Sequence, residues 1–224
     1  MTALEELTAG VIECRRCPRL VAWREQVALE KRAAYAGEEY WGRPVPGFGD
    51  PRARLVVVGL APGAHGANRT GRMFTGDRSG DWLYRALFRT GFATQSESKG
   101  RDDGLRLTEA WITAPVRCAP PRNRPTAEER DACSDWFDRE LDLLTETRVY
   151  VTLGQFGYQA LWRSLGRSRT LPRPRPRFGH GLEIALGDVT LLTSYHVSQQ
   201  NTFTGRLTED MLDAVFSRAA ALAG

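Results

Sequence analysis

The feature that most limits the fold of this chain is a set of four short apolar runs separated by long intervals. The runs cover residues 54–59, 110–113, 149–153 and 189–193, and they are rich in valine, leucine and threonine. Their length and composition are typical of buried strands. Stretches with helical spacing lie between and after them, at 81–91, from Thr126 onward, at 156–165 and at 207–222. This alternation predicts an α/β fold with a central, mostly parallel four-stranded sheet and helices on both faces.

The remaining segments give no sign of a second folding unit. Two helical stretches, 4–12 and 20–30, precede the first strand, and 35–51 reads as a long ordered loop rich in glycine, proline and aromatic residues. No repeat or shift in composition marks a boundary, so we expect residues 1–224 to form one domain. The longest apolar runs are strand-sized and the first residues do not resemble a signal peptide. We therefore expect a cytoplasmic monomer that does not enter a membrane.

The basic residues of this chain are unusual in kind. The net charge is +4, and 29 of the 31 basic residues are arginines. Because a guanidinium presents a planar fork that suits phosphate, this composition is consistent with an anionic partner. A compositional bias spread over the surface explains the count equally well. Two local groups of arginines, within 117–124 and 167–177, are the candidates for phosphate contacts.

Four cysteines have a spacing that indicates a shared site. Cys14 and Cys17 form a C-x2-C pair, and Cys118 and Cys133 follow about a hundred positions later. In a reducing compartment such a set is typical of metal ligands or redox groups rather than disulfides. The spacing alone is compatible with a structural zinc ion and with an iron-sulfur cluster.

The loops after the four predicted strands are the candidates for a functional cleft. In open parallel sheets ligands bind at the carboxyl ends of the strands, so the loops that begin at Leu60, Ala114, Gly154 and Ser194 should lie together. The first loop, 59–77, contains five glycines but has neither the Walker nor the dinucleotide-binding spacing. Phe74 could stack on a base or belong to the core. Asp77 could act as an acid or base, or cap a helix.

The loop after the last predicted strand carries the other candidate. His196 lies among polar residues in 194–206, at a position where active-site residues are common. A single histidine in a loop is often only a surface or hydrogen-bonding residue, so this assignment depends on its neighbours.

Taken together, these segments resemble the uracil-DNA glycosylase superfamily, and within it the iron-sulfur family five. The matching pieces are 14–20, the glycine-rich loop 59–77, the segment 116–125 before Cys133, and the HVSxQN-type segment that begins at His196. They occur in the family's order and span nearly the whole chain. The resemblance implies the superfamily's central parallel sheet and the removal of deaminated bases from DNA in base excision repair.

The resemblance also implies roles for individual residues. Cys14, Cys17, Cys118 and Cys133 would hold a structural [4Fe-4S] cluster. His196 would hydrogen-bond the departing base, and Asp77, with Asn123 as a second candidate, would position the attacking water. The residues expected to line the base pocket are Ala61, Phe74, Ala114, His196 and Asn201.

This chain departs from better-known relatives at two of those positions. Ala61 stands where many members have the water-activating Asp or Asn, and Ala114 stands where related families have an Asn that reads uracil. A pocket with fewer polar contacts should discriminate poorly between bases, so we expect activity on uracil and on hypoxanthine in DNA.

Strand cleavage in addition to base removal would need an amine nucleophile. The two lysines, Lys31 and Lys99, lie outside the motif loops, so we expect a monofunctional glycosylase. Two other classes of protein remain compatible with parts of the sequence. A DNA-binding module with a metal cluster and no catalysis would need the cysteines and arginines only, and a hydrolase of free nucleotides would explain the glycine-rich loop.

Overall fold

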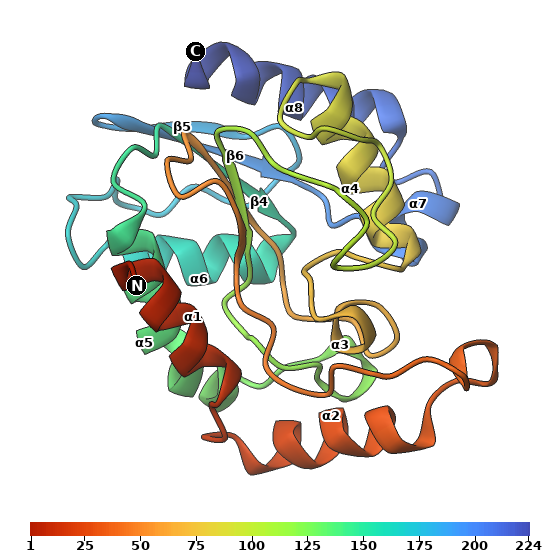
Figure 1. Ribbon diagram of the computed structural model, residues 1–224. Helices are drawn as coiled ribbons and strands as arrows, with labels where there is room; N and C mark the ends of the chain where they lie inside the picture. The colour runs from red at the N-terminus through yellow and green to blue at the C-terminus, as the bar shows by residue number, and fades with distance from the viewer.

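A six-stranded sheet organises the chain. Helices lie on both faces of this sheet (Figure 1). The structure is a computed structural model that describes residues 1–224. The strands are β1 (Phe48–Gly49), β2 (Leu55–Val58), β3 (Ala110–Thr113), β4 (Val149–Leu153), β5 (Glu183–Leu186) and β6 (Val189–Ser194). The α-helices are α1 (Ala3–Ile12), α2 (Pro18–Glu30), α3 (Ala67–Thr70), α4 (Arg78–Arg89), α5 (Ala127–Leu143), α6 (Gln155–Leu165), α7 (Gln199–Phe203) and α8 (Glu209–Ala223), with 3₁₀ turns η1 (Ala33–Tyr35) and η2 (Pro121–Asn123).

The four predicted strands form the parallel centre of the sheet. The strand order is β1-β3-β2-β4-β6-β5, and β3, β2, β4 and β6 pair in parallel. In this register Val57 lies opposite Ile112 on one side and Val151 on the other. The expectation of an α/β sheet is confirmed, and the carboxyl ends of these four strands lie along one edge.

The predicted number of strands was wrong, because the sheet has six strands rather than four. The two additional strands, β1 and β5, pair antiparallel with β3 and β6 at the two edges. Only two residues make up β1, too few to form a pattern. In β5 exposed and buried residues alternate over four positions, since one face of this edge strand is open to solvent. A search for continuous apolar runs detects central strands and misses edges of this kind.

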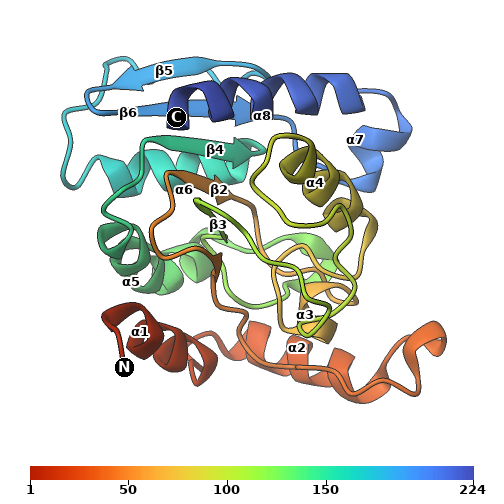
Figure 2. The ribbon, with the colours of Figure 1, turned by 45° about the horizontal axis from the view of Figure 1, so that its top comes forward.

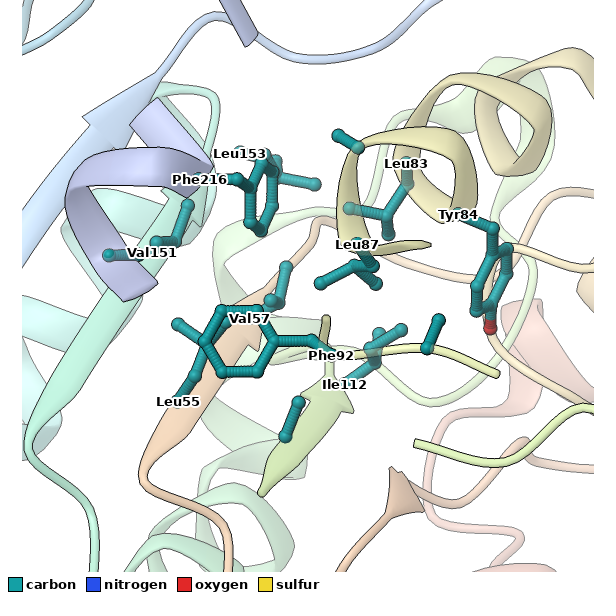
Figure 3. Packing of buried hydrophobic residues seen from close by; sticks show 14 of the residues in the cluster. Leu55, Val57, Leu83, Tyr84, Leu87, Phe92, Ile112, Val151, Leu153 and Phe216 are labelled. Atoms are coloured by element: carbon teal, nitrogen blue, oxygen red, sulfur yellow. The ribbon is translucent and has the colours of Figure 1, made fainter. Parts of the chain in front are cut away.

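Side chains alternate between two hydrophobic cores, one on each face of the sheet. Figure 3 shows the first core, in which Val57, Ile112 and Val151 of the sheet belong to the same hydrophobic cluster as Leu83 of α4 and Phe216 of α8. The second core packs the opposite faces of the same strands against α5 and α6. Every residue of β2, β3 and β4 is buried, which is typical of strands covered by helices on both sides.

Polar side chains cap the first turn of several helices. Thr126 and Glu129 form a capping box at the start of α5, where the sequence predicted a helix. Asp77 caps α4, so this helix begins at Arg78, three residues before the predicted start. The short helices α3 and α7 lie inside segments that we expected to be loops.

The two N-terminal helices pack against other helices rather than directly against the strands of the sheet. In both Figure 1 and Figure 2, α1 lies next to α5, and α2 runs past α3, which belongs to the loop after β2. This arrangement places the start of the chain against two segments that carry candidate site residues. None of the helices has the length and apolar character that crossing a membrane would require.

Candidate active site and cysteine pocket

Phe74 lies at the carboxyl end of β2, in the glycine-rich loop. Its backbone has a φ of 52°, and its half-buried ring covers Gly59, where an added Cβ would lie 2.8 Å from two ring carbons. Glycine at position 59 is therefore what allows the ring to lie directly against the backbone at the end of the strand. The ring packs on the edge of the first core without being enclosed by it.

His196 reaches the same place from the carboxyl end of β6. The ring centroids of His196 and Phe74 are 6.2 Å apart, with an angle of 33° between the ring planes. Gly154, directly after β4, has a φ of +91°, and an added Cβ there would lie 3.1 Å from the Cβ of His196. The loops after β2, β4 and β6 therefore meet, as the strand topology predicted.

The surroundings of His196 keep its imidazole neutral. Asn201 on α7 donates its Nδ2 hydrogen to the carbonyl oxygen of His196 at 2.8 Å, which fixes the backbone that carries the ring. Burial lowers the pKa of His196 to about 4, since a charged imidazole would lose its hydration there. At neutral pH the side chain can donate one N–H hydrogen bond without carrying a charge.

Asp77 has two oxygens with different surroundings. Oδ1 accepts a hydrogen bond of 3.0 Å from the backbone N–H of Gly80 and so caps α4. Oδ2 faces the turn made by Gly63 and Gly66, where added Cβ atoms would lie 2.9 Å and 2.1 Å from it. Burial raises the pKa of this carboxyl, and hydrogen bonds from the backbone N–H groups of Gly80 and Ser79 oppose the increase. The cap and the acid or base interpretations of Asp77 therefore do not exclude one another.

Three other predicted site residues lie in three different settings. Ala114 is buried at 1% exposure in the first core, against which Phe74 also packs. Ala61 packs instead beside Cys118, towards the cysteines. Asn123 lies on η2 with a φ of 55°, and its exposed carboxamide makes no hydrogen bond within the protein. The catalytic role of Asn123 and the place of Ala61 in the base pocket both stay predictions.

The four cysteines surround one pocket, although they come from three distant parts of the chain. Cys14 and Cys17 lie between α1 and α2, Cys118 follows β3, and Cys133 lies on α5. All four thiols are free, and the rest of the lining is mostly apolar. Burial raises the pKa of Cys118 to about 11 and that of Cys133 to about 12. No three His, Cys, Asp or Glu side chains are grouped closely enough to hold a single metal ion.

Two buried guanidinium groups accompany the cysteines, and sequence reasoning missed both. Arg24 and Arg117 have side chains that are 2% and 1% exposed. Arg117 was expected among the phosphate contacts, but it is enclosed and pairs with Glu140 at 2.6 Å, so it is not available to DNA. A signal for Arg24 was present, because this residue lies in the apolar stripe of α2 with Leu20 and Val27.

A further pair near the glycine-rich loop was also missed. The hydroxyl of Tyr40 lies 3.1 Å from Nδ1 of His65, which stands in the turn that faces Asp77. Arg69 donates from Nε to the carbonyl oxygen of His65 at 2.9 Å and from Nη2 to that of Gly76 at 3.0 Å. These bonds hold the two ends of the loop around Asp77 together.

Comparison with known proteins places this arrangement in a family. The model of the Uracil DNA glycosylase superfamily matches residues 46–220. A "Type-5 uracil-DNA glycosylase" of Mycobacterium tuberculosis is 57% identical over 221 residues, which are 98% of this chain and 81% of the relative. Proteins with the same description are 55% identical in Thermus thermophilus, over 98% of both chains, and 47% identical in Pyrobaculum aerophilum, over 98% of this chain and 93% of the relative.

The matched range contains all six strands and the loops that carry Phe74, Asp77, Asn123 and His196. The resemblance that the sequence motifs indicated is thus confirmed over the whole sheet. The chain belongs to the uracil DNA glycosylase superfamily, beside its type-5 members.

Proposed function

We propose that this protein is a uracil-DNA glycosylase of base excision repair, which hydrolyses the N-glycosidic bond of deaminated bases in DNA and leaves an abasic site. The observation that carries the proposal is the meeting of Phe74 and His196 at the carboxyl edge of the sheet, with Asp77 three residues from Phe74. The type-5 relatives support it at 47–57% identity over nearly the whole chain.

Catalysis begins with a nucleotide rotated out of the DNA stack, because a base inside the duplex cannot reach a recessed site. The ring of Phe74 offers a stacking surface for the extruded base, and stacking on an aromatic side chain is worth about 1–3 kcal/mol in single-strand systems. Rotation costs least for a mispaired base, so uracil opposite guanine is a favourable substrate.

Bond cleavage leaves negative charge on the base and positive charge on the sugar. His196 is placed to donate a hydrogen bond to a base oxygen, and as a neutral donor it stabilises the departing anion without transferring its proton. Asp77 uses Oδ2 to orient the attacking water while Oδ1 continues to cap α4. Asn123 is the second candidate for holding that water.

The base pocket lacks a side chain that selects uracil. Ala114 contributes only a methyl group, so nothing at this position rejects a purine by leaving a polar group unpaired. We therefore propose that hypoxanthine is removed as well as uracil.

The cysteine pocket suits a [4Fe-4S] cluster held by Cys14, Cys17, Cys118 and Cys133. Four thiolate ligands give such a site negative charge, and the buried Arg24 supplies positive charge beside it. These cysteines would let a bound cluster tie the N-terminal helices to the segment after β3 and to α5, and no step of the proposed reaction needs redox chemistry. A visible absorption spectrum separates this proposal from zinc, which is colourless.

Strand cleavage is not part of the proposed reaction. Lys31 ends α2, and Lys99 is exposed and pairs with Glu97 at 2.6 Å, so neither amine belongs to a site loop. Borohydride should therefore trap no covalent adduct between the protein and uracil-containing DNA. A trapped adduct would show that an amine of the protein attacks the sugar, and this enzyme would then also cleave the strand.

We propose that DNA contacts come from exposed groups around the site. Arg173, Arg175 and Arg177 are exposed on the proline-rich segment before β5 and are free of carboxylate partners. Phe203 on α7 is 63% exposed, with Arg78 stacked 4.7 Å from its ring centroid, and is the candidate to fill the gap left by the extruded base. We expect the protein to act on DNA as a monomer.

The test is incubation of the purified protein with a uracil-containing oligonucleotide, followed by alkaline cleavage of abasic sites. Wild-type protein should produce a labelled fragment of the expected length. A His196→Ala variant provides the matched control and should be slower by about 100-fold or more, as for other lost oxyanion donors. DNA binding without cleavage product in the wild type would instead favour a non-catalytic DNA-binding module.

A further inference from the structure

Arg24 is a buried cation directly behind the cysteine pocket. It lies on α2, and its Nη1 donates hydrogen bonds to Sγ of Cys118 at 3.0 Å and to the carbonyl oxygen of Cys14 at 3.2 Å. The side chain is 2% exposed and does not line the pocket itself. It therefore contacts the cysteine sulfur without lining the cavity.

The charge of Arg24 is only partly balanced by a carboxylate. Its nearest carboxylate, that of Glu25, is 3.8 Å away, and Glu25 is engaged by both terminal nitrogens of Arg15. Nε of Arg24 is buried and makes no hydrogen bond. Burial of an incompletely paired cation is costly, so a further negative group beside Arg24 would stabilise the protein.

The second buried guanidinium offers an internal comparison. Arg117 lines the pocket, but Nη2 of Arg117 lies 2.6 Å from the Glu140 carboxylate, which also accepts a hydrogen bond from the hydroxyl of Thr113. The positive charge of Arg117 is thus balanced within the protein. Arg24 alone provides a buried positive charge that is still available to the thiolates.

The backbone of Arg24 is also fixed. The fully buried Asn68 of α3 donates its Nδ2 hydrogen to the carbonyl oxygen of Arg24 at 3.1 Å. In both ribbon views α2 runs past α3, which belongs to the loop that carries Asp77. The guanidinium is therefore held against Cys118 by a helix that is anchored on another element.

We propose that Arg24 is a positioning residue for the iron-sulfur cluster. Arg24 holds the sulfur of Cys118 by an N–H···S hydrogen bond and offsets the negative charge of the four thiolates. The inference rests on the proposed cluster. Hydrogen bonds to sulfur and nearby charge both set the reduction potential of such clusters. A cation close to the sulfurs favours the more negative, reduced state, so its removal should lower the midpoint potential.

The experiment compares three variants of the purified, cluster-loaded protein. Arg24→Met removes the charge and the hydrogen bond, Arg24→Lys keeps the charge and loses the fork, and Arg16→Met is the matched control. Arg16 also lines the pocket, but it is 47% exposed and pairs with Asp135 at 3.4 Å. Iron content, the midpoint potential from a mediated spectroelectrochemical titration, and the rate of iron transfer to a chelator are measured for each protein.

Arg24→Met should lower the midpoint potential and weaken iron retention by roughly 10-fold to 100-fold, the usual effect of losing a group that supports a ligand. Arg24→Lys should show a smaller drop in potential and still lose iron faster than the wild type. Arg16→Met should shift the midpoint potential and the iron-transfer rate much less than Arg24→Met does, because the charge of Arg16 is exposed and screened by solvent.

Separate outcomes address the cluster and the arginine. Wild-type protein without iron would refute the cluster proposal itself. If the wild type holds a cluster and Arg24→Met has an unchanged potential and iron-transfer rate, the role of Arg24 is refuted. An equal shift in Arg16→Met would also refute it, since a general charge effect would then be enough. Should Arg24→Met fail to fold, the comparison of Arg24→Lys with the wild type decides, and identical values would overturn the inference.

Discussion

A methyl group on Gly66 would lie 2.1 Å from Oδ2 of Asp77, so the turn that holds Gly66 closes directly over the carboxylate. A Gly66→Ala substitution must therefore displace either the turn or Asp77. Because displacement of a catalytic group by about 1 Å can cost about 100-fold in rate, we expect a loss of that order in uracil release. Single-turnover kinetics on a uracil-containing duplex measures it.

Gly37→Ala is the control for this prediction, because no atom lies within 4 Å of a Cβ added at that position. It should retain wild-type activity. Wild-type activity in Gly66→Ala would show that Asp77 does not need its present position.

Asp77→Asn separates the two tasks of this side chain. Asparagine caps helices as well as aspartate does, so the melting temperature should change little. It cannot accept a proton from water, so the rate of base release should fall by about 100-fold to 10,000-fold. Thermal denaturation and single-turnover kinetics on the same preparation check both parts.

Asp77→Ala completes that comparison, since it removes the cap as well. Beyond the kinetic defect, it should lower the free energy of unfolding by about 1 kcal/mol relative to Asp77→Asn. Equal stability of the two variants would mean that the hydrogen bond from Gly80 to Asp77 contributes nothing to stability. Full activity of Asp77→Asn would mean that another group, such as Asn123, activates the water.

His196 should make stability depend on pH in a defined window. Its pKa is about 4 in the folded protein and 6.5 without burial, so between these values the unfolded chain binds a proton that the folded chain does not. As pH falls from 6.5 towards 4, His196 should therefore remove up to about 3 kcal/mol from the free energy of unfolding. His196→Gln lacks this loss.

Urea denaturation of the wild type and His196→Gln at pH 7 and at pH 4.5 measures the effect. The difference in unfolding free energy between the two proteins should move in favour of the variant at the lower pH. A difference that does not change with pH would contradict the burial of a neutral imidazole.

Ala114→Asn should change the preference between bases. Asparagine adds an amide that can pair with the edge of uracil, while its bulk and unpaired groups disfavour hypoxanthine. We expect the ratio of rates, uracil over hypoxanthine, to rise by about 10-fold or more in single-turnover assays. An unchanged ratio would remove Ala114 from the base pocket, and circular dichroism controls for the added volume at this buried position.

The central part of the fold was predictable because its signals are local. Four strands buried on both faces appear as continuous apolar runs, and a capping residue such as Thr126 indicates where a helix begins. The edge strands were not predictable in this way, since β1 has two residues and β5 is defined by its pairing with β6. Edges depend on a neighbour that only the folded chain provides.

The site could be predicted as a set of loops, but its geometry could not. That Phe74 approaches His196 follows from the strand order, and no local pattern encodes that order. Arg117 shows the opposite error, because a basic residue in a basic segment proved to be paired inside the protein with Glu140. Local composition does not reveal which arginines fold inward.

The shared use of Asp77 as helix cap and proposed water ligand also has a genetic consequence. An aspartate codon becomes an asparagine codon by one G-to-A transition, which arises when cytosine on the complementary strand loses its amino group. Such a mutation would produce a folded protein that still binds damaged DNA but releases no base. Deamination of cytosine at this codon would thus inactivate the enzyme that is proposed to remove deaminated bases from DNA.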